Sequence, residues 1–132
     1  MVNRLPDELT QFIRAHLGSV WALELMLKMM SRPDLVWTVE QLVRELRATD
    51  LLVSGLLARF ERAGFVVSGG EDAWQWRPAN PQLDQLSRQT AEAHAATPFA
   101  VVQVIAEAPA YSLQEFADAF RLRRDKGDKG KP

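Results

Sequence analysis

The chain has 132 residues, of which 47% are hydrophobic and 25% are charged, and its formal net charge is −1. These values are typical of a globular protein with one domain and a core of its own. The absence of cysteine excludes a disulfide framework and thiolate metal ligands. The nearly neutral charge excludes a chain that is basic throughout, so nucleic-acid binding would need a basic face.

Residues 1–18 predict an N-terminal helix. Pro6 suits a first helical turn, Asp7 and Glu8 favour the positive end of the helix dipole, and Gly18 ends the pattern. The same two carboxylates interrupt the apolar run that a signal peptide needs, so we expect a cytoplasmic protein. The most apolar stretch, residues 20–30, is too short to cross a bilayer, so we expect no membrane partner.

Residues 20–31 predict a second helix, which Ser19 caps and which ends at residues 32–34. Apolar side chains cover most of its circumference, so this helix is expected to be buried on more than one side. We place it centrally, between the following pair of helices and the terminal helices. Residues 35–37 predict a short extended link that adds a third strand beside a later hairpin.

Two further helices follow, separated by a turn at residues 48–50. Thr38 and Gln41 have the spacing of a capping box for the first of them. Thr49 caps the second, residues 50–63, and Gly64 supplies the left-handed residue with which many helices end.

A β-hairpin is predicted directly after Gly64. Its strands are residues 65–67 and 74–76, joined by a loop over residues 68–72. Trp74 and Trp76 alternate with Gln75 and so share one face, where we expect them to cover the core; the alternative is an aromatic platform for a ligand. The fold class is therefore mainly α with a small β-hairpin.

The remainder of the chain predicts helices. Asn80 and Pro81 open a long one that ends near residue 96 and has a thin apolar stripe suited to one partner helix. Residues 99–108 have no periodicity that separates helix from strand. The Thr97-Pro98 start favours a helix.

The last part of the chain predicts one more helix and a tail. Ser112 and Glu115 form another capping box, and Leu113, Phe116, Ala117 and Phe120 follow at helical spacing. Residues 125–132 are expected to be a disordered basic tail.

The order of these elements resembles the winged-helix regulators of bacteria, in the neighbourhood of the MarR and PadR groups. The resemblance is carried by the apolar helix 20–30, the sequence WTVEQL from Trp37, the sequence LLARFERAGFV from Leu56 and the pair Gly69-Gly70. It implies a winged helix-turn-helix over residues 19–78, an N-terminal helix over residues 1–18 and a C-terminal helical extension over residues 79–124. In this group the helices after the wing often build a dimer, so a homodimer is expected.

The resemblance also implies that the second helix of the pair enters the major groove of DNA. The candidate contact residues are Arg47, Thr49, Asp50, Leu51, Val53, Ser54, Glu71, Asp72 and Arg77. Of those in the second helix and its cap, Thr49 and Ser54 suit base reading, whereas Leu51 and Val53 are apolar. Residues 38–77 hold five basic and six acidic side chains, and the wing loop carries Glu71 and Asp72.

These residue types and charges are compatible with two functions. The frequency of DNA binding in the family favours a transcription regulator. The acidic wing and the apolar second helix favour the alternative, a protein-interaction module that does not bind DNA.

No catalytic or metal-binding motif is evident in the sequence. His16 and His94 lie far apart, without the spacing of a zinc site, and Gly69-Gly70 suits a hairpin turn rather than a phosphate loop. We interpret His16 as a half-buried packing residue. We therefore expect no enzyme, no metal and no cofactor.

Overall fold

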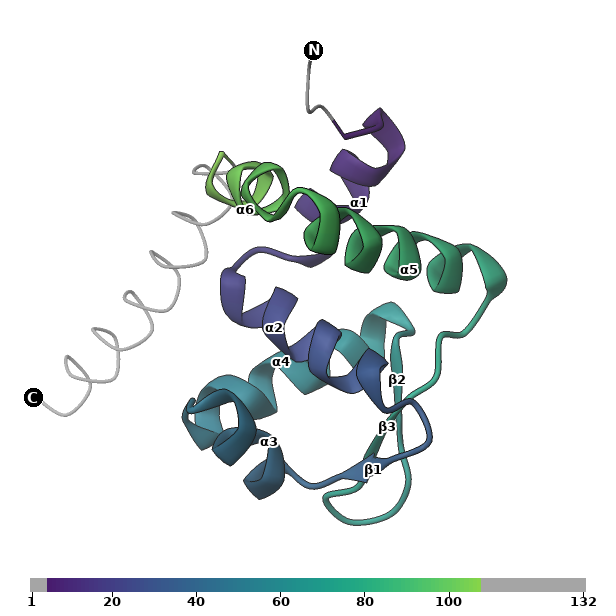
Figure 1. The fold of residues 1–132 in the computed structure, drawn as a ribbon. Coiled ribbons are helices and arrows are strands. Elements are labelled where there is room, and N and C mark those ends of the chain that lie inside the picture. The colour runs from purple at the N-terminus through teal and green to yellow at the C-terminus, as the bar shows by residue number, and fades with distance from the viewer. Residues whose placement is uncertain (1–4, 108–132) are drawn as a thin grey trace, which may run out of the picture.

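Helix α2 (Val20–Ser31) runs through the middle of the molecule, with one layer of structure on each side (Figure 1). The computed structural model describes residues 5–107. One layer holds three helices, α1 (Asp7–His16), α5 (Pro81–Ala96) and α6 (Pro98–Ala106). The other layer holds α3 (Val39–Leu46), α4 (Asp50–Ala63) and a small antiparallel sheet. The described fold is mainly helical, as predicted, and α2 has the predicted central position.

The sheet has three strands in the order β1-β3-β2. They are β1 (Val36–Trp37), β2 (Val66–Ser68) and β3 (Trp74–Trp76). Val36 pairs with Gln75, and Val66 pairs with Trp76. The predicted third strand is thus confirmed.

Strand β2 starts one residue later than predicted. The Phe65 amide donates to the Phe60 carbonyl at 2.9 Å and so closes helix α4 rather than pairing with β3. Gly64 between them has a φ of 96°. A helix that ends on a left-handed glycine needs this backward hydrogen bond from the residue that follows.

The predicted helix caps are confirmed by their hydrogen bonds. Thr38 Oγ1 accepts from the Gln41 amide at 3.1 Å, while Gln41 Oε1 accepts from the Thr38 amide at 3.0 Å. Ser19 and Asn80 cap α2 and α5 with one bond each, in which the side-chain oxygen accepts from the amide three residues later, at 3.2 and 2.9 Å. Local side-chain chemistry therefore sets where these helices begin.

The ring of Phe65 joins the two layers. Phe12 and His16 of α1 contact it edge-on, at ring-centre distances of 5.7 and 5.1 Å. Phe60 of α4 lies 5.4 Å away, and Trp76 stacks on it at 5.6 Å. His16 is therefore a packing residue and Trp76 covers the core, as predicted.

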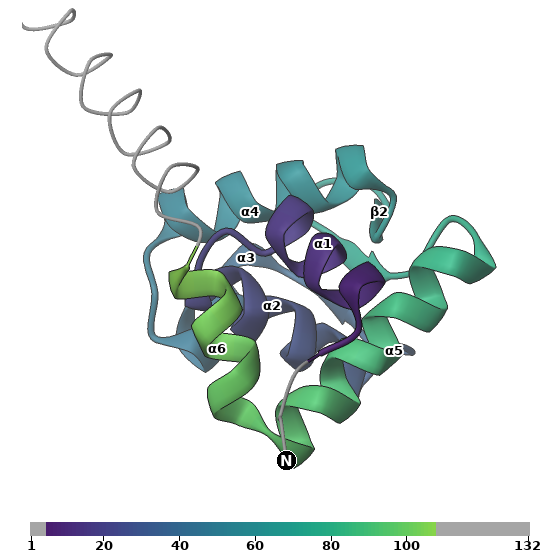
Figure 2. The same ribbon diagram turned by 90° about the horizontal axis from the view of Figure 1, so that it is seen from above.

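The helices that flank the α2–β3 segment in sequence pack against each other (Figures 1 and 2). Helix α5 contacts both α1 and α6, and α1 contacts α6. The buried residues of α5, Leu86, Ser87 and Thr90, lie on the face that this packing covers. Residues 98–106 are helical, as predicted from the Thr97-Pro98 start.

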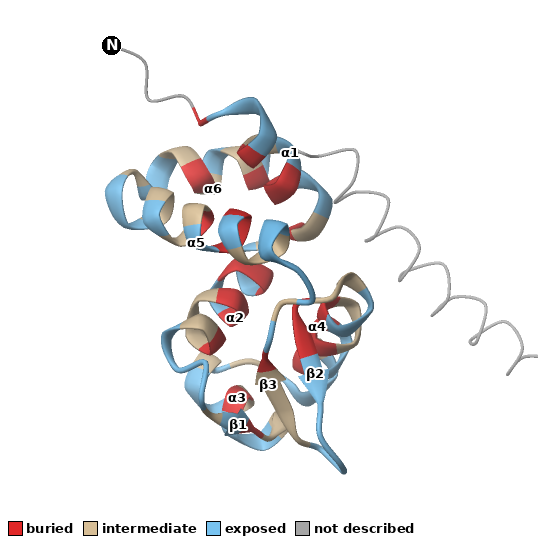
Figure 3. Ribbon diagram, turned by 90° about the vertical axis from the view of Figure 1, so that its right-hand side faces the viewer, coloured by how far each residue is buried: buried red, intermediate tan, exposed pale blue. Residues whose placement is uncertain are grey.

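Buried residues from both layers and from α2 form one hydrophobic core (Figure 3). The predicted helix after Ser112 and the predicted tail at residues 125–132 lie outside the described residues. In the described part of the chain, no helix has the length and apolar character needed to cross a membrane.

Candidate functional site

The turn between α3 and α4 depends on Arg47. This residue adopts φ 55° and ψ 47°, in the left-handed region, and the Ala48 amide donates to the Val43 carbonyl at 3.1 Å. The same backward bond closes α4 beside Gly64. A left-handed backbone costs a residue with a Cβ atom about 1–2 kcal/mol. Arg47 therefore shapes the turn as well as placing a cation there, a role that only glycine or asparagine would have signalled in the sequence.

The start of α4 is exposed to solvent. Thr49 Oγ1 accepts from the Leu52 amide at 3.1 Å, which leaves its hydroxyl hydrogen able to donate outward. Leu51 is 84% exposed, and Asp50 and Ser54 are exposed as well. These residues share the first two turns of the helix.

The prediction that Val53 contacts a partner is wrong, because Val53 has no exposed surface. Its side chain begins the inward face of α4, which continues through Leu56, Leu57 and Phe60 at helical spacing. The exposed face instead includes Gly55, which the sequence prediction missed. A Cβ atom at Gly55 would meet nothing within 4 Å.

The hairpin loop is tied to the start of α3 by Asp72. Its Oδ1 atom accepts from the Val39 amide at 3.0 Å, and its φ of 51° is left-handed. Because the amide end of a helix carries partial positive charge, the carboxylate is well placed there. Asp72, predicted as a contact residue, is thus a capping residue, and Glu71 beside it stays exposed.

One further carboxylate near this surface is paired. Glu45 forms an ion pair with Lys28 at 3.1 Å, whereas Glu61, at the far end of α4, accepts from the Ser68 hydroxyl at 2.9 Å and keeps its charge. Arg44 and Arg47 are exposed at the end of α3. The charge at the turn is therefore more favourable to an anionic partner than the count over residues 38–77 indicates.

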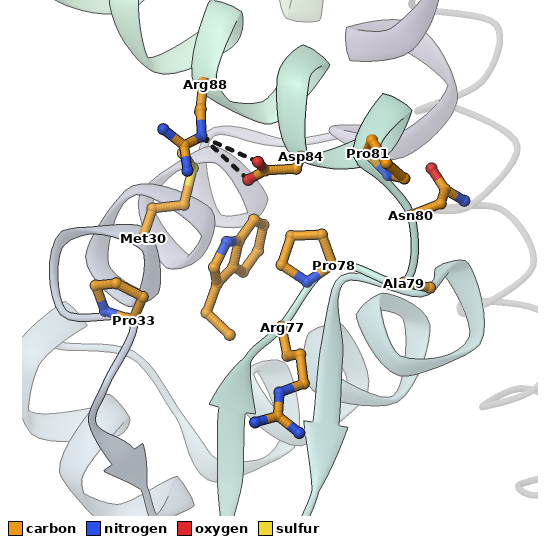
Figure 4. Close-up of a pocket in the computed structure, with 10 residues that line it drawn as sticks. Met30, Pro33, Arg77, Pro78, Ala79, Asn80, Pro81, Asp84 and Arg88 are labelled. Carbon is orange, nitrogen blue, oxygen red and sulfur yellow. Dashed lines mark hydrogen bonds and ion pairs between the residues drawn. The ribbon is translucent and has the colours of Figure 1, made fainter.

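Arg77 lies away from the start of α4. It lines a cleft of about 770 Å³ between the sheet, the end of α2 and the start of α5, where Figure 4 shows it pointing away from Asp84. The Ala79 amide bonds to the Gly64 carbonyl, which fixes this segment at the far end of α4, about 20 Å along the helix from Asp50. The structure therefore does not bring Arg77 together with the other candidates.

The same cleft holds an ion pair between Arg88 and Asp84 at 3.1 Å. Met30, Trp76 and Pro78 supply apolar lining. The two charges on α5 satisfy each other at the surface, so Arg77 is the one charged side chain of the cleft lining that lies outside this ion pair.

His16 has a lowered pKa in the folded chain. Burial is the main cause, because it disfavours the charged ring, and the nearby Arg59 guanidinium adds repulsion. The ring lies between α1 and the end of α4, away from the start of α4. Among residues 5–107, no group of three or more histidine, aspartate or glutamate side chains is placed to hold a metal ion.

Comparison with known proteins does not assign the chain to a family. No protein-family model, curated protein sequence or solved structure matches the chain.

Proposed function

We propose that residues 19–78 form a winged helix-turn-helix that binds double-stranded DNA, with the start of α4 in the major groove and the β2–β3 hairpin as the wing. The order of elements and the strand order β1-β3-β2 support this proposal. The observation that carries it is the open start of α4, beside which Arg44 and Arg47 stand exposed. As a regulator of this kind, the protein would act in the cytoplasm.

Each exposed residue has a distinct role in the proposal. The hydroxyls of Thr49 and Ser54 reach base edges, and Leu51 contacts a thymine methyl group. Arg44 and Arg47 neutralise phosphates, which supply most of the non-specific affinity. Asp50 opposes this binding, because its carboxylate has the same sign as the phosphates.

The test uses Arg47→Gly, which removes the cation and suits the left-handed turn. Fluorescence anisotropy with a labelled mixed-sequence duplex, titrated at several salt concentrations, gives the slope of log K against log salt. Each lost phosphate contact reduces the size of that slope by about 0.9. We expect this reduction for Arg47→Gly and unchanged binding for Arg14→Gln, an exposed control on α1. Absence of binding by the parent chain at low salt would remove the proposal.

The second candidate function is protein binding by the same face. It is favoured by Leu51, whose side chain is 84% exposed at the centre of this surface, and by Glu71 in the wing loop. Affinity capture with the full chain as bait would be compared with Leu51→Ser combined with Glu71→Lys. This function predicts proteins that bind the parent and not the variant; an identical captured set would contradict it.

We also propose that the chain forms a homodimer, as the resemblance implies. The inward face of α5 is covered by α1 and α6, so a dimer must use another surface. Sedimentation velocity at several concentrations tests this, and a single monomeric species at high concentration would contradict it.

A further inference from the structure

Helices α2 and α3 leave an open apolar groove on one side of the molecule. Its volume is about 520 Å³, and it is lined by Val20, Trp21, Glu24, Lys28, Glu45 and Leu46. Val20 and Trp21 are 44% and 40% exposed. Exposed apolar side chains gathered with a polar rim are typical of a binding surface.

The groove runs between two points that matter for the rest of the chain. Its upper end is the start of α2, which lies on the same side of the molecule as the end of α6 in both ribbon views (Figures 1 and 2). Leu46, the last residue of α3, also lines the groove, so the groove borders the turn before Leu51. A chain that leaves α6 at Ala106 therefore emerges beside the upper end of the groove.

The sequence that follows has the pattern of an amphipathic helix. Leu113, Phe116, Ala117 and Phe120 fall on one face, and Ser112 with Glu115 caps its start. Isolated helices shorter than about 12–15 residues are marginal in water. A helix over residues 112–120 therefore needs a surface to cover its apolar face.

We propose that residues 112–120 of the same chain dock into the groove between α2 and α3. The six residues from Glu107 to Ser112 reach about 20 Å when extended, and they follow α6 on the side of the molecule where α2 begins. A nine-residue helix and the span from Val20 to Lys28 are both about 12 Å long. The mode is that of a helix laid in an apolar groove.

The charges of the two parts are complementary. Lys28 and Glu45 on the rim of the groove pair with each other, so Glu24 leaves the rim with a net charge of −1, and Arg121, Arg123 and Arg124 follow the predicted helix. In this arrangement the basic residues come to lie near the α3–α4 turn. The docking does not depend on what the start of α4 binds.

Hydrogen–deuterium exchange on the full chain tests the docking. We expect the amides of residues 114–120 to exchange at least about tenfold more slowly than in a synthetic peptide of residues 108–132, because an undocked helix of this length opens continually. Phe116→Ser with Phe120→Ser should remove this protection from the tail side, and Trp21→Ser should remove it from the groove side. Slow exchange in α4 confirms that each variant is folded.

Phe99→Ser is the matched control, because Phe99 is 76% exposed on α6 and lies outside the groove. It should leave the protection unchanged. Exchange at the peptide rate in the parent chain, or protection that survives Trp21→Ser in a folded protein, would overturn the proposal. Protection that disappears on dilution together with a dimer would also overturn it, in favour of docking onto a second copy.

Discussion

Alanine substitutions at Gly55, within α4, and at Gly64, which ends it, should change stability in opposite directions. Gly55 lies in the middle of the helix on its exposed face, with open space where a Cβ atom would be. Glycine in a helix interior is about 0.8–1 kcal/mol less favourable than alanine. We therefore expect Gly55→Ala to raise the free energy of unfolding by about that amount.

Gly64→Ala should lower the free energy of unfolding. The φ of 96° costs alanine about 1–2 kcal/mol. In addition, the new Cβ atom would lie 3.2 Å from both Ala79 Cβ and Leu83 Cδ1, so α5 or the segment before it would have to shift. The two variants should therefore differ by about 2–3 kcal/mol.

Urea unfolding followed by tryptophan fluorescence measures the difference. With a slope of about 1.5 kcal/mol/M, the midpoint should rise by about 0.6 M for Gly55→Ala and fall by about 1 M for Gly64→Ala. An unchanged midpoint for Gly64→Ala would refute the left-handed helix end, and a lower midpoint for Gly55→Ala would refute an open helical site. The DNA titration of Gly55→Ala adds a second readout. The new methyl group should weaken DNA binding, because it would obstruct a close partner, while it stabilises the fold.

Three further predictions concern the stability of the fold at Asp72, Phe65 and His16. Asp72→Ala should lower the free energy of unfolding by about 1–2 kcal/mol in urea titrations, because it removes a helix cap, whereas Asp72→Asn, which keeps an acceptor, should stay within about 0.5 kcal/mol. Phe65→Ala should lower it by about 3–5 kcal/mol, and a loss below about 1 kcal/mol would argue against Phe65 as the contact between layers. Because the folded chain holds the pKa of His16 below its ordinary value, the unfolded chain binds the proton first as the pH falls, so stability present near pH 7 should decline from about pH 6.5 downward. His16→Phe should flatten this decline in urea titrations at several pH values, whereas His94→Gln should keep it.

The helix boundaries could be predicted because each depends on a few neighbouring residues. Thr38 with Gln41, Thr49 and Gly64 carry their signals in side-chain type and spacing alone. The third strand was also foreseen, from the short β-branched and aromatic link that ends at Trp37. Local chemistry thus accounts for the element order and for most of the caps.

The candidate contact surface was predicted less well, because it depends on which way α4 is rotated. A helix with apolar residues at positions 51, 52, 53, 56 and 57 does not reveal which of them face inward. Packing places Val53 inside and Leu51 outside. The positions of Asp72 and Arg77 depend on hydrogen bonds with residues distant in sequence. Asp72 accepts from the Val39 amide, and the Arg77 amide donates to the Phe65 carbonyl. The role of Arg47 in the turn could not be predicted, because no local signal marks an arginine with a left-handed backbone.

The layer formed by α1, α5 and α6 also bears on the order in which the chain folds. Residues 17–80 separate α1 from α5, so closing this layer confines a long intervening loop, whereas α2 to β3 form a continuous segment. During synthesis α1 leaves the ribosome first, the α2–β3 segment follows, and α5 and α6 come last. Until α5 and α6 follow, α1 lacks two of the helices that it packs against, so this layer can close only late in synthesis.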